Sequence, residues 1–312
     1  MSIDYSVVMI VGEDEEFTEY LLDLHHYLTS ITACHELILV FNGPNESARQ
    51  RFESDWPAQG PEVLMVELHR KVYSGTCLQS LLSDCRGEIL LICGPYRQVA
   101  DEGLVKMLNA VDSGEADLAL PWRQSRVDPP INQLQSWLFN LLVYQMTAVR
   151  IHDLNCALRI VRRTVLEEST FHGDLYRFLP LMAQKRGFKI IEIPTPHVQE
   201  KGKVGYFGLR VYINRLVDLL TIHFNLNFAR KPLRYFGFRG GVLLLLGILL
   251  LTYAFVARAA GIDSLGNSPL LMTGLFSVLA GSGLWGVGLL GEILVFALGR
   301  KRKDYVIETI LD

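Results

Sequence analysis

Residues 36–41 read ELILVF, a short apolar run that leads directly into the turn Asn42-Gly43-Pro44-Asn45. A run of this length bounded by turn residues is typical of a buried β-strand. Four further short apolar runs share this character: residues 6–11, 63–68, 88–93 and 116–120. Helical spacing of leucines separates several of them, as in residues 21–28. The alternation predicts the α/β class, with a mainly parallel sheet and helices on both of its faces.

Composition and the placement of charge exclude several classes of protein. Half of the 312 residues are hydrophobic and only 20% are charged, which argues against a disordered chain. The formal net charge of −3 hides a strong asymmetry. Residues 1–199 hold 17 Lys and Arg against 26 Asp and Glu, whereas residues 200–239 hold 8 against 2. The basic charge is therefore concentrated just before the most apolar part of the chain. This pattern predicts that the chain binds a membrane surface and does not bind nucleic acid.

Two uncharged runs predict membrane-spanning helices. The first is GGVLLLLGILLLTYAFVA, between Arg239 and Arg258, and the second is SLGNSPLLMTGLFSVLAGSGLWGVGLLG, between Asp263 and Glu292. Both approach or exceed the length that crosses a hydrocarbon core of about 30 Å. The alternative is a helical hairpin buried in the core of a soluble protein. Helices of soluble proteins need a polar face, and neither run has one.

The flanking charges predict the orientation of these spans. Lys and Arg gather before the first span and after the second, at positions 230, 231, 234, 239 and 300–303. The positive-inside rule then places both termini and the preceding domain in the cytoplasm, at the inner membrane.

Residues 209–228 (LRVYINRLVDLLTIHFNLNF) separate polar from apolar side chains at helical spacing. This pattern favours a helix that lies in the membrane interface, and a helix packed on its own domain is the alternative. The expected parts of the chain follow in order: a globular domain at 1–207, a basic juxtamembrane segment at 208–237, spans at 238–260 and 266–298, and a cytoplasmic tail at 299–312.

In doubly wound sheets, ligands bind beyond the carboxyl ends of the strands. The residues to inspect are therefore those that follow each predicted strand. Gly75, at the start of a predicted helix, could present backbone N–H groups to a phosphate.

Several blocks of sequence carry a resemblance to a known family. SVVMIVGEDEE, ELILVFNGPNES and SGTCLQSLLSDCRGEILLICGP resemble the nucleotide-binding half of family 2 glycosyltransferases, which have the GT-A fold. IHDLNCALRIVRR, HGDLYRFLPLMAQKRGFKIIEIP and FARKPLRYFG resemble membrane-anchored polyprenyl-phosphate glycosyltransferases, such as dolichyl-phosphate mannose synthase and the bacterial undecaprenyl-phosphate enzymes. The resemblance extends over almost the entire chain.

The resemblance implies transfer of a hexose from a nucleotide-sugar to a polyprenyl phosphate, and it leaves homo-oligomerisation open. It implies catalytic roles for Asp153, Asp174 and Arg177. A lipid-phosphate site would draw on Lys203, Arg230 and Lys231. The residues expected at the nucleotide-sugar are Glu13, Asp14, Asn42, Gly43, Arg70, Gly75, Cys93, Pro95 and Arg97.

The expected metal site departs from the family. The family usually holds Mg²⁺ or Mn²⁺ with a D-x-D motif after the fourth strand, where this chain has Cys93-Gly94-Pro95. This position offers no carboxylate, and the five scattered cysteines lack zinc-site spacing. No residue is therefore predicted as a metal ligand. The departure also raises a second hypothesis, a catalytically lapsed paralogue that serves as a membrane-bound partner or regulator.

Overall fold

The computed structural model of the chain describes most residues before 199 and two long helices near the end. The described residues are 3–12, 17–31, 34–124, 130–147, 149–169, 173–198, 216–221, 224, 231–261 and 269–298. They belong to two compact units, one up to Leu219 and one from Leu220 to Lys303.

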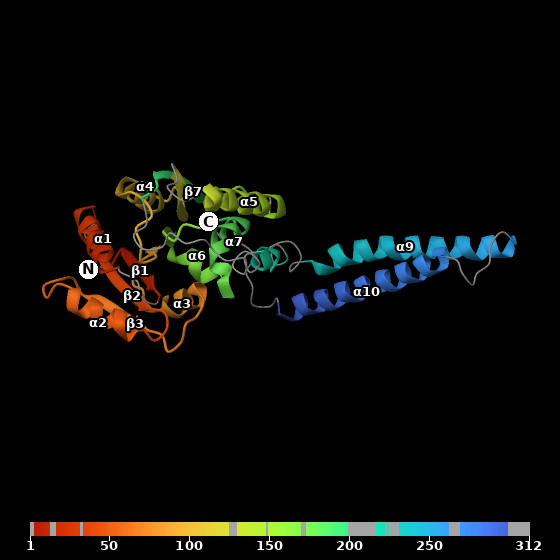
Figure 1. Ribbon diagram of the computed structural model, residues 1–312, viewed down its shortest axis with the longest axis horizontal. Coiled ribbons are helices and arrows are strands. Elements are labelled where there is room, and N and C mark those ends of the chain that lie inside the picture. The colour runs from red at the N-terminus through yellow and green to blue at the C-terminus, as the bar shows by residue number, and fades with distance from the viewer. Residues whose placement is uncertain are drawn as a thin grey trace, which may run out of the picture. The chain divides into compact units, whose positions relative to one another are not determined.

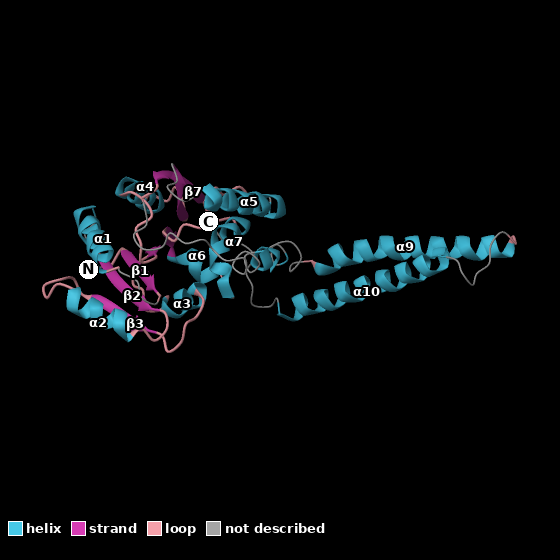
Figure 2. Ribbon diagram, viewed as in Figure 1, coloured by secondary structure: helices cyan, strands magenta, loops and turns pink. Residues whose placement is uncertain are grey.

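The first unit is built on a seven-stranded sheet with the order β3-β2-β1-β4-β6-β5-β7 (Figure 2). Its strands are β1 (Tyr5–Val11), β2 (His35–Phe41), β3 (Val63–Glu67), β4 (Ile89–Cys93), β5 (Leu118–Gln124), β6 (Arg159–Arg162) and β7 (Ile190–Pro196). Strands β3, β2, β1 and β4 are parallel to one another, and β6 runs antiparallel to both β4 and β5. The predicted mainly parallel α/β sheet is therefore confirmed, with one antiparallel strand inserted in it.

Helices connect these strands, as the crossover of parallel strands requires. They are α1 (Thr18–Ile31), α2 (Glu46–Asp55), α3 (Ser74–Leu81), α4 (Asp101–Asp112), α5 (Pro130–Thr147), α6 (Arg163–Glu168), the 3₁₀ helix η1 (Gly173–Phe178) and α7 (Leu179–Arg186). Helix α1 buries Leu21, Leu24 and Leu28, which recur at three- and four-residue intervals. They pack into one core with side chains of β1, β2 and β4, such as Met9 and Leu91.

All five strands expected from the sequence are present, with ends that shift by a few residues. The largest shift is in β5, which continues to Gln124 instead of ending at Leu120. This extension is important for the site, because it places Arg123 at the carboxyl end of a strand.

The second unit contains α9 (Pro232–Ala259) and α10 (Pro269–Leu298), which lie side by side along their length (Figure 1). Both are long and apolar enough to cross a membrane. Only 22% of the most apolar stretch of α9 and 11% of that of α10 are buried. Glycines allow the close contact between them: a Cβ added at Gly240 would lie 2.7 Å from the carbonyl oxygen of Gly281. Trp285 donates a hydrogen bond from its indole N–H to the Gly237 carbonyl at 2.8 Å.

Only part of the expected interfacial helix at 209–228 lies within the described residues. Residues 216–221 are helical, and Leu216, Val217, Leu220 and Phe224 are exposed. The proposal that this segment lies in the membrane interface stays a prediction.

Candidate active site

The loops after β1, β2, β3 and β4 lie at one edge of the sheet, because these four strands are parallel. Asn42, directly after β2, connects two of these loops. Its side-chain amide donates to the Val72 carbonyl at 2.8 Å, and its side-chain oxygen accepts from the Val72 N–H at 2.9 Å. Asn42 is 9% exposed. This reciprocal pair holds the loop after β3 against the end of β2.

Gly43 and Asn45 complete this turn. Gly43 has φ +108°, and a Cβ there would lie 3.2 Å from the backbone nitrogen of Lys71, so a side chain would be strained at this position. Asn45 donates to the Gly12 carbonyl after β1, and its side-chain oxygen accepts from Ala48 N, which caps α2. Loops from three strands are thereby joined by short hydrogen bonds.

The start of α3 lies beside this turn. Gly75 is buried in its first turn, and Tyr73 at the N-cap position makes no side-chain capping bond. Arg70 and Lys71 precede it with exposed side chains. The expected phosphate-binding elements therefore lie in one segment of chain, next to Asn42.

The end of β4 differs in character from these loops. Cys93 is 3% exposed, and burial raises the pKa of its thiol to about 12. Pro95 and Arg97 are half-buried in the following loop. Arg97 forms an ion pair with Asp101 in the first turn of α4, and it lines a cavity of about 420 Å³ together with Tyr20 and Tyr27 of α1.

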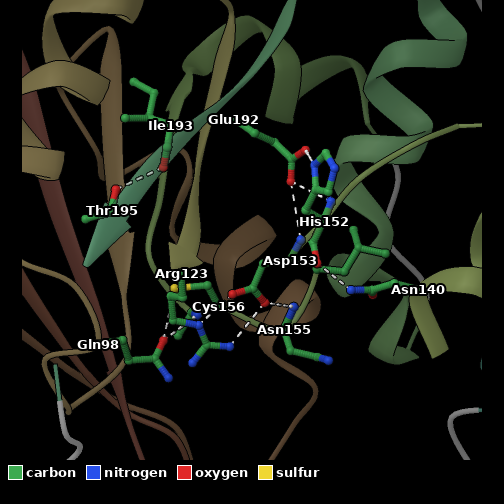
Figure 3. A network of polar contacts seen from close by, with 12 residues as sticks. Gln98, Arg123, Asn140, His152, Asp153, Asn155, Cys156, Glu192, Ile193 and Thr195 are labelled. Carbon is green, nitrogen blue, oxygen red and sulfur yellow. Dashed lines mark hydrogen bonds and ion pairs between the residues drawn. The ribbon is translucent and has the colours of Figure 1, made fainter. Parts of the chain in front are cut away.

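A buried ion pair lies at the carboxyl end of β5 (Figure 3). Arg123 donates from Nε to Asp153 Oδ2 at 2.6 Å and from Nη2 to Oδ1 at 3.1 Å. The two side chains are 4% and 3% exposed. Asp153 Oδ1 also accepts from the Asn155 N–H at 3.2 Å. The bidentate pair holds the loop before β6 in place, so the Asp153 carboxylate has a structural role here. Its expected catalytic role stays a prediction.

Glu192 of β7 holds the same loop from another side (Figure 3). Its Oε1 accepts from the backbone N–H groups of His152 at 2.7 Å and Asp153 at 3.3 Å. Its Oε2 lies 2.8 Å from His152 Nδ1. The imidazole ring stacks on Trp122 of β5, with centroids 4.2 Å apart. His152 is the more exposed member of this group, at 40%.

Gln98 connects the loop after β4 to the loop before β6. Its side-chain oxygen accepts from the Ala157 N–H at 2.8 Å and from the Cys156 thiol at 3.2 Å. These contacts draw the β4 end, where the donor site is expected, toward the loop that contains Asp153.

Arg159, buried on β6, organises η1. Its guanidinium donates to the backbone carbonyls of Tyr176 at 2.6 Å and Arg177 at 3.1 Å. The Arg177 backbone is thereby anchored, and its side chain is half-buried. Asp174 belongs to the same 3₁₀ helix.

Asn42, Gly43, Arg70, Gly75, Cys93, Pro95 and Arg97, which are expected at the nucleotide-sugar, lie at or just after the carboxyl ends of β2, β3 and β4, and their expected role stays a prediction. Lys231 is exposed at the N-cap position of α9. Four expected residues lie outside the described ranges: Glu13, Asp14, Lys203 and Arg230. Sequence reasoning did not single out Gln98, Glu192 or Arg159, and it included Arg123 only within the range 121–126 that follows the last predicted strand. The available signal for Arg123 was its place just beyond the expected strand end at Leu120; in the structure it lies within β5.

The described residues do not fit the divalent cation of the GT-A fold. Among them, no three His, Cys, Asp or Glu side chains form a group that could hold a metal ion. The sulfur of Cys93, at the D-x-D position, is a poor ligand for a hard cation, which prefers oxygen donors.

Comparison with known proteins gives full-length relatives. No protein-family model matches the chain. The chain is 24% identical over 317 residues to dodecaprenyl-phosphate galacturonate synthase of Rhizobium johnstonii, covering 100% of this chain and 94% of that protein. It is 27% identical over 309 residues to undecaprenyl-phosphate 4-deoxy-4-formamido-L-arabinose transferase of Pseudomonas fluorescens, covering 98% and 89%. The resemblance to membrane-anchored polyprenyl-phosphate glycosyltransferases is therefore confirmed.

A solved structure shares the fold. Glucosyl-3-phosphoglycerate synthase of Mycobacterium tuberculosis, crystallised with Mn²⁺, uridine diphosphate and glucosyl-3-phosphoglycerate, matches with a TM-score of 0.50 at 10% identity. The match covers 70% of this chain and 79% of that one. At this identity the likeness shows the fold alone, and the expected GT-A fold is confirmed.

Proposed function

We propose that this chain transfers a sugar from a nucleotide-sugar to the phosphate of a polyprenyl lipid at a membrane surface. The observation that carries the proposal is the end-to-end similarity to two polyprenyl-phosphate sugar transferases, which covers 98–100% of this chain and so includes both apolar helices. The parallel sheet, whose loops meet at one edge, supplies the fold for a nucleotide-sugar site.

In this proposal the chain's own residues bind and orient the donor. Asn42 and Gly43 hold the loop after β3 against the end of β2, next to the proposed donor site. The first N–H groups of α3 and the exposed side chains of Arg70 and Lys71 provide positive charge for the diphosphate. A lipid phosphate is already anionic near pH 7, so stabilising the leaving diphosphate is a larger requirement than activating the acceptor.

The acceptor side of the proposal rests on cations. Lys203, Arg230 and Lys231 remain the residues predicted to bind the lipid phosphate, and Arg177, whose backbone Arg159 anchors, keeps its predicted catalytic role. The apolar acceptor tail would stay in the bilayer, which explains why such an enzyme carries two long apolar helices. We assign both termini to the cytoplasmic side of the inner membrane, from the Lys and Arg clusters that flank the helices.

No step is derived through a metal ion, because the described residues do not offer a suitable ligand set. The Mn²⁺ in the fold neighbour makes metal dependence the first property to measure. If cationic side chains carry the diphosphate, turnover should persist in a chelator. The lapsed-paralogue alternative is not favoured, because the full-length relatives are named as transferases.

The test uses the full chain, purified in detergent, with polyprenyl phosphate and a panel of nucleotide-sugars that includes uronic acid and aminoarabinose derivatives. We expect a sugar-linked lipid phosphate with at least one donor, detected by mass spectrometry. Asn42→Ala should weaken nucleotide binding roughly tenfold, because losing contacts of about 1.4 kcal/mol has that effect. Asn109→Ala, on the exposed face of α4, is the matched control. No product and no nucleotide binding with any donor would contradict the proposal.

A further inference from the structure

Helix α10 carries one charged side chain. Its 30 residues contain Glu292 and no other Asp, Glu, Lys or Arg. An ionisable group is costly in an apolar helix that is long enough to cross a membrane, so such a group usually has a specific partner and a function. The contacts of Glu292 therefore indicate what it does.

The partner of the Glu292 carboxylate is the first turn of α9. Its Oε2 accepts from the Leu233 N–H at 3.2 Å. Helix α9 begins at Pro232, which has no N–H, and Lys231 at the N-cap position makes no side-chain capping bond. The Leu233 N–H is therefore the first backbone donor of the helix, and it has no acceptor within α9. A carboxylate from α10 satisfies this donor and complements the positive end of the helix dipole.

Two glycines of α10 allow the carboxylate to reach this turn. A Cβ at Gly291 would lie 2.8 Å from the Cβ of Pro232, and a Cβ at Gly288 would lie 3.3 Å from the Cα of Leu233. The backbone of α10 therefore lies directly against the first turn of α9. Pro232 is buried by this contact, whereas Lys231, one residue earlier, is exposed.

We propose that Glu292 is a positioning residue for the acceptor phosphate. This inference rests on the proposed function, in which Arg230 and Lys231 bind the lipid phosphate. Both residues directly precede Pro232, so the point at which α9 begins determines where their backbone lies. Glu292 fixes that point, because it holds the N–H that follows Pro232. Its effect on the acceptor passes through the first turn of α9.

A role for Glu292 as a general base does not fit this contact. The carboxylate already accepts a hydrogen bond from the backbone, and a lipid phosphate that is anionic near pH 7 does not require a strong base. Glutamine separates the two roles. Its carbonyl oxygen can accept from the Leu233 N–H, but it cannot take up a proton near neutral pH.

The first measurement is steady-state kinetics of the full chain in detergent, with polyprenyl phosphate varied. Glu292→Ala should raise the KM for polyprenyl phosphate about 3- to 30-fold, the factor by which losing a helix cap shifts an equilibrium. The kcat and the KM for the nucleotide-sugar should change little, because the predicted donor residues belong to the first unit. Glu292→Gln should stay within about threefold of the wild type, since it keeps the acceptor oxygen.

Ser277→Ala is the matched control for these variants. Ser277 also lies in α10, but its hydroxyl donates to the Thr273 carbonyl at 2.8 Å, within the same helix. Its loss should leave both KM values unchanged.

The second measurement does not depend on turnover. A spin label at Lys231→Cys reports the mobility of the start of α9, and a label at Arg258→Cys reports its other end. Both are made in a Cys34→Ser background, because the other four cysteines are buried. Glu292→Ala should increase the mobility of the label at 231 and leave the label at 258 unchanged, and Glu292→Gln should change neither.

Several results would overturn the proposal. One is a KM for polyprenyl phosphate in Glu292→Ala that equals that of Ser277→Ala. Another is a Glu292→Gln variant that is as impaired as Glu292→Ala, which would assign the carboxylate a role that needs its charge. A wild type that forms no product with any donor would overturn the proposed function, and the acceptor role of Glu292 with it. The label at 231 would then still decide whether Glu292 fixes the start of α9.

Discussion

Replacing Asp153 by Asn should destabilise the globular unit strongly. The variant keeps the size of the side chain but removes the charge that faces Arg123, whose own side chain is only 4% exposed. The Nε–Oδ2 and Nη2–Oδ1 contacts of 2.6 and 3.1 Å form a bidentate pair with little access to water. After the substitution, a guanidinium charge stays buried without a counter-charge.

The size of the effect follows from that burial. Removing one partner of a buried ion pair costs about 3–5 kcal/mol. For a unit of this size, 1 kcal/mol shifts Tm by about 2–4 °C, so we expect Tm to fall by about 6–20 °C. The assay is thermal unfolding of the detergent-purified full chain, followed by tryptophan fluorescence at one fixed scan rate.

Glu167→Gln is the matched control. Glu167 pairs with Arg163 at 2.8 Å, but its side chain is 48% exposed. Exposed pairs contribute about 0–1 kcal/mol, so Tm should change by no more than a few degrees. An Asp153→Asn variant whose Tm shift equals that of the control would refute the reasoning, since the carboxylate would then not balance a buried charge.

A double variant separates stability from chemistry. Arg123→Met with Asp153→Leu removes both charges together and should recover most of the lost stability. If Asp153 only positions its loop, the double variant retains measurable turnover. A double variant with recovered Tm and no turnover would instead assign the Asp153 carboxylate a catalytic role.

Three further predictions concern other parts of the molecule. Gly281→Ala should destabilise the α9–α10 contact by about 1–3 kcal/mol, because its Cβ would lie 2.7 Å from backbone atoms of α9. A Cβ at Gly283 meets nothing within 4 Å, so Gly283→Ala is the control, and limited proteolysis in detergent compares the two variants. Burial raises the pKa of the Cys93 thiol to about 12, so the thiolate forms only near that pH. Iodoacetamide at pH 8 should therefore modify Cys34 and spare Cys93, and modified Cys93 in the mass spectrum would contradict this. A cysteine placed within residues 262–268 should react with an impermeant reagent from outside intact cells, and labelling only from the cytoplasmic side would refute the topology.

The local elements could be predicted from the sequence because they depend on patterns a few residues long. Residues 36–41 and 88–93 read as buried strands, and they form β2 and β4 with nearly the expected ends. The two long uncharged runs likewise predicted α9 and α10, since length and apolar composition alone define a candidate span. Asn42 and Gly43 could be selected because a turn directly follows a strand.

The tertiary structure decided how these elements combine. Arg123 and Asp153 are 30 residues apart, and so are Asn42 and Val72; nothing in either local segment specifies its partner. The partnerships arise because β6 enters the sheet antiparallel between β4 and β5, and because parallel strands bring distant loops to one edge. Which side of α5 faces the core likewise depends on the surface that receives the helix. Apolar periodicity is a property of neighbouring residues, whereas burial, charge pairing and exposure depend on contacts between residues far apart in the chain.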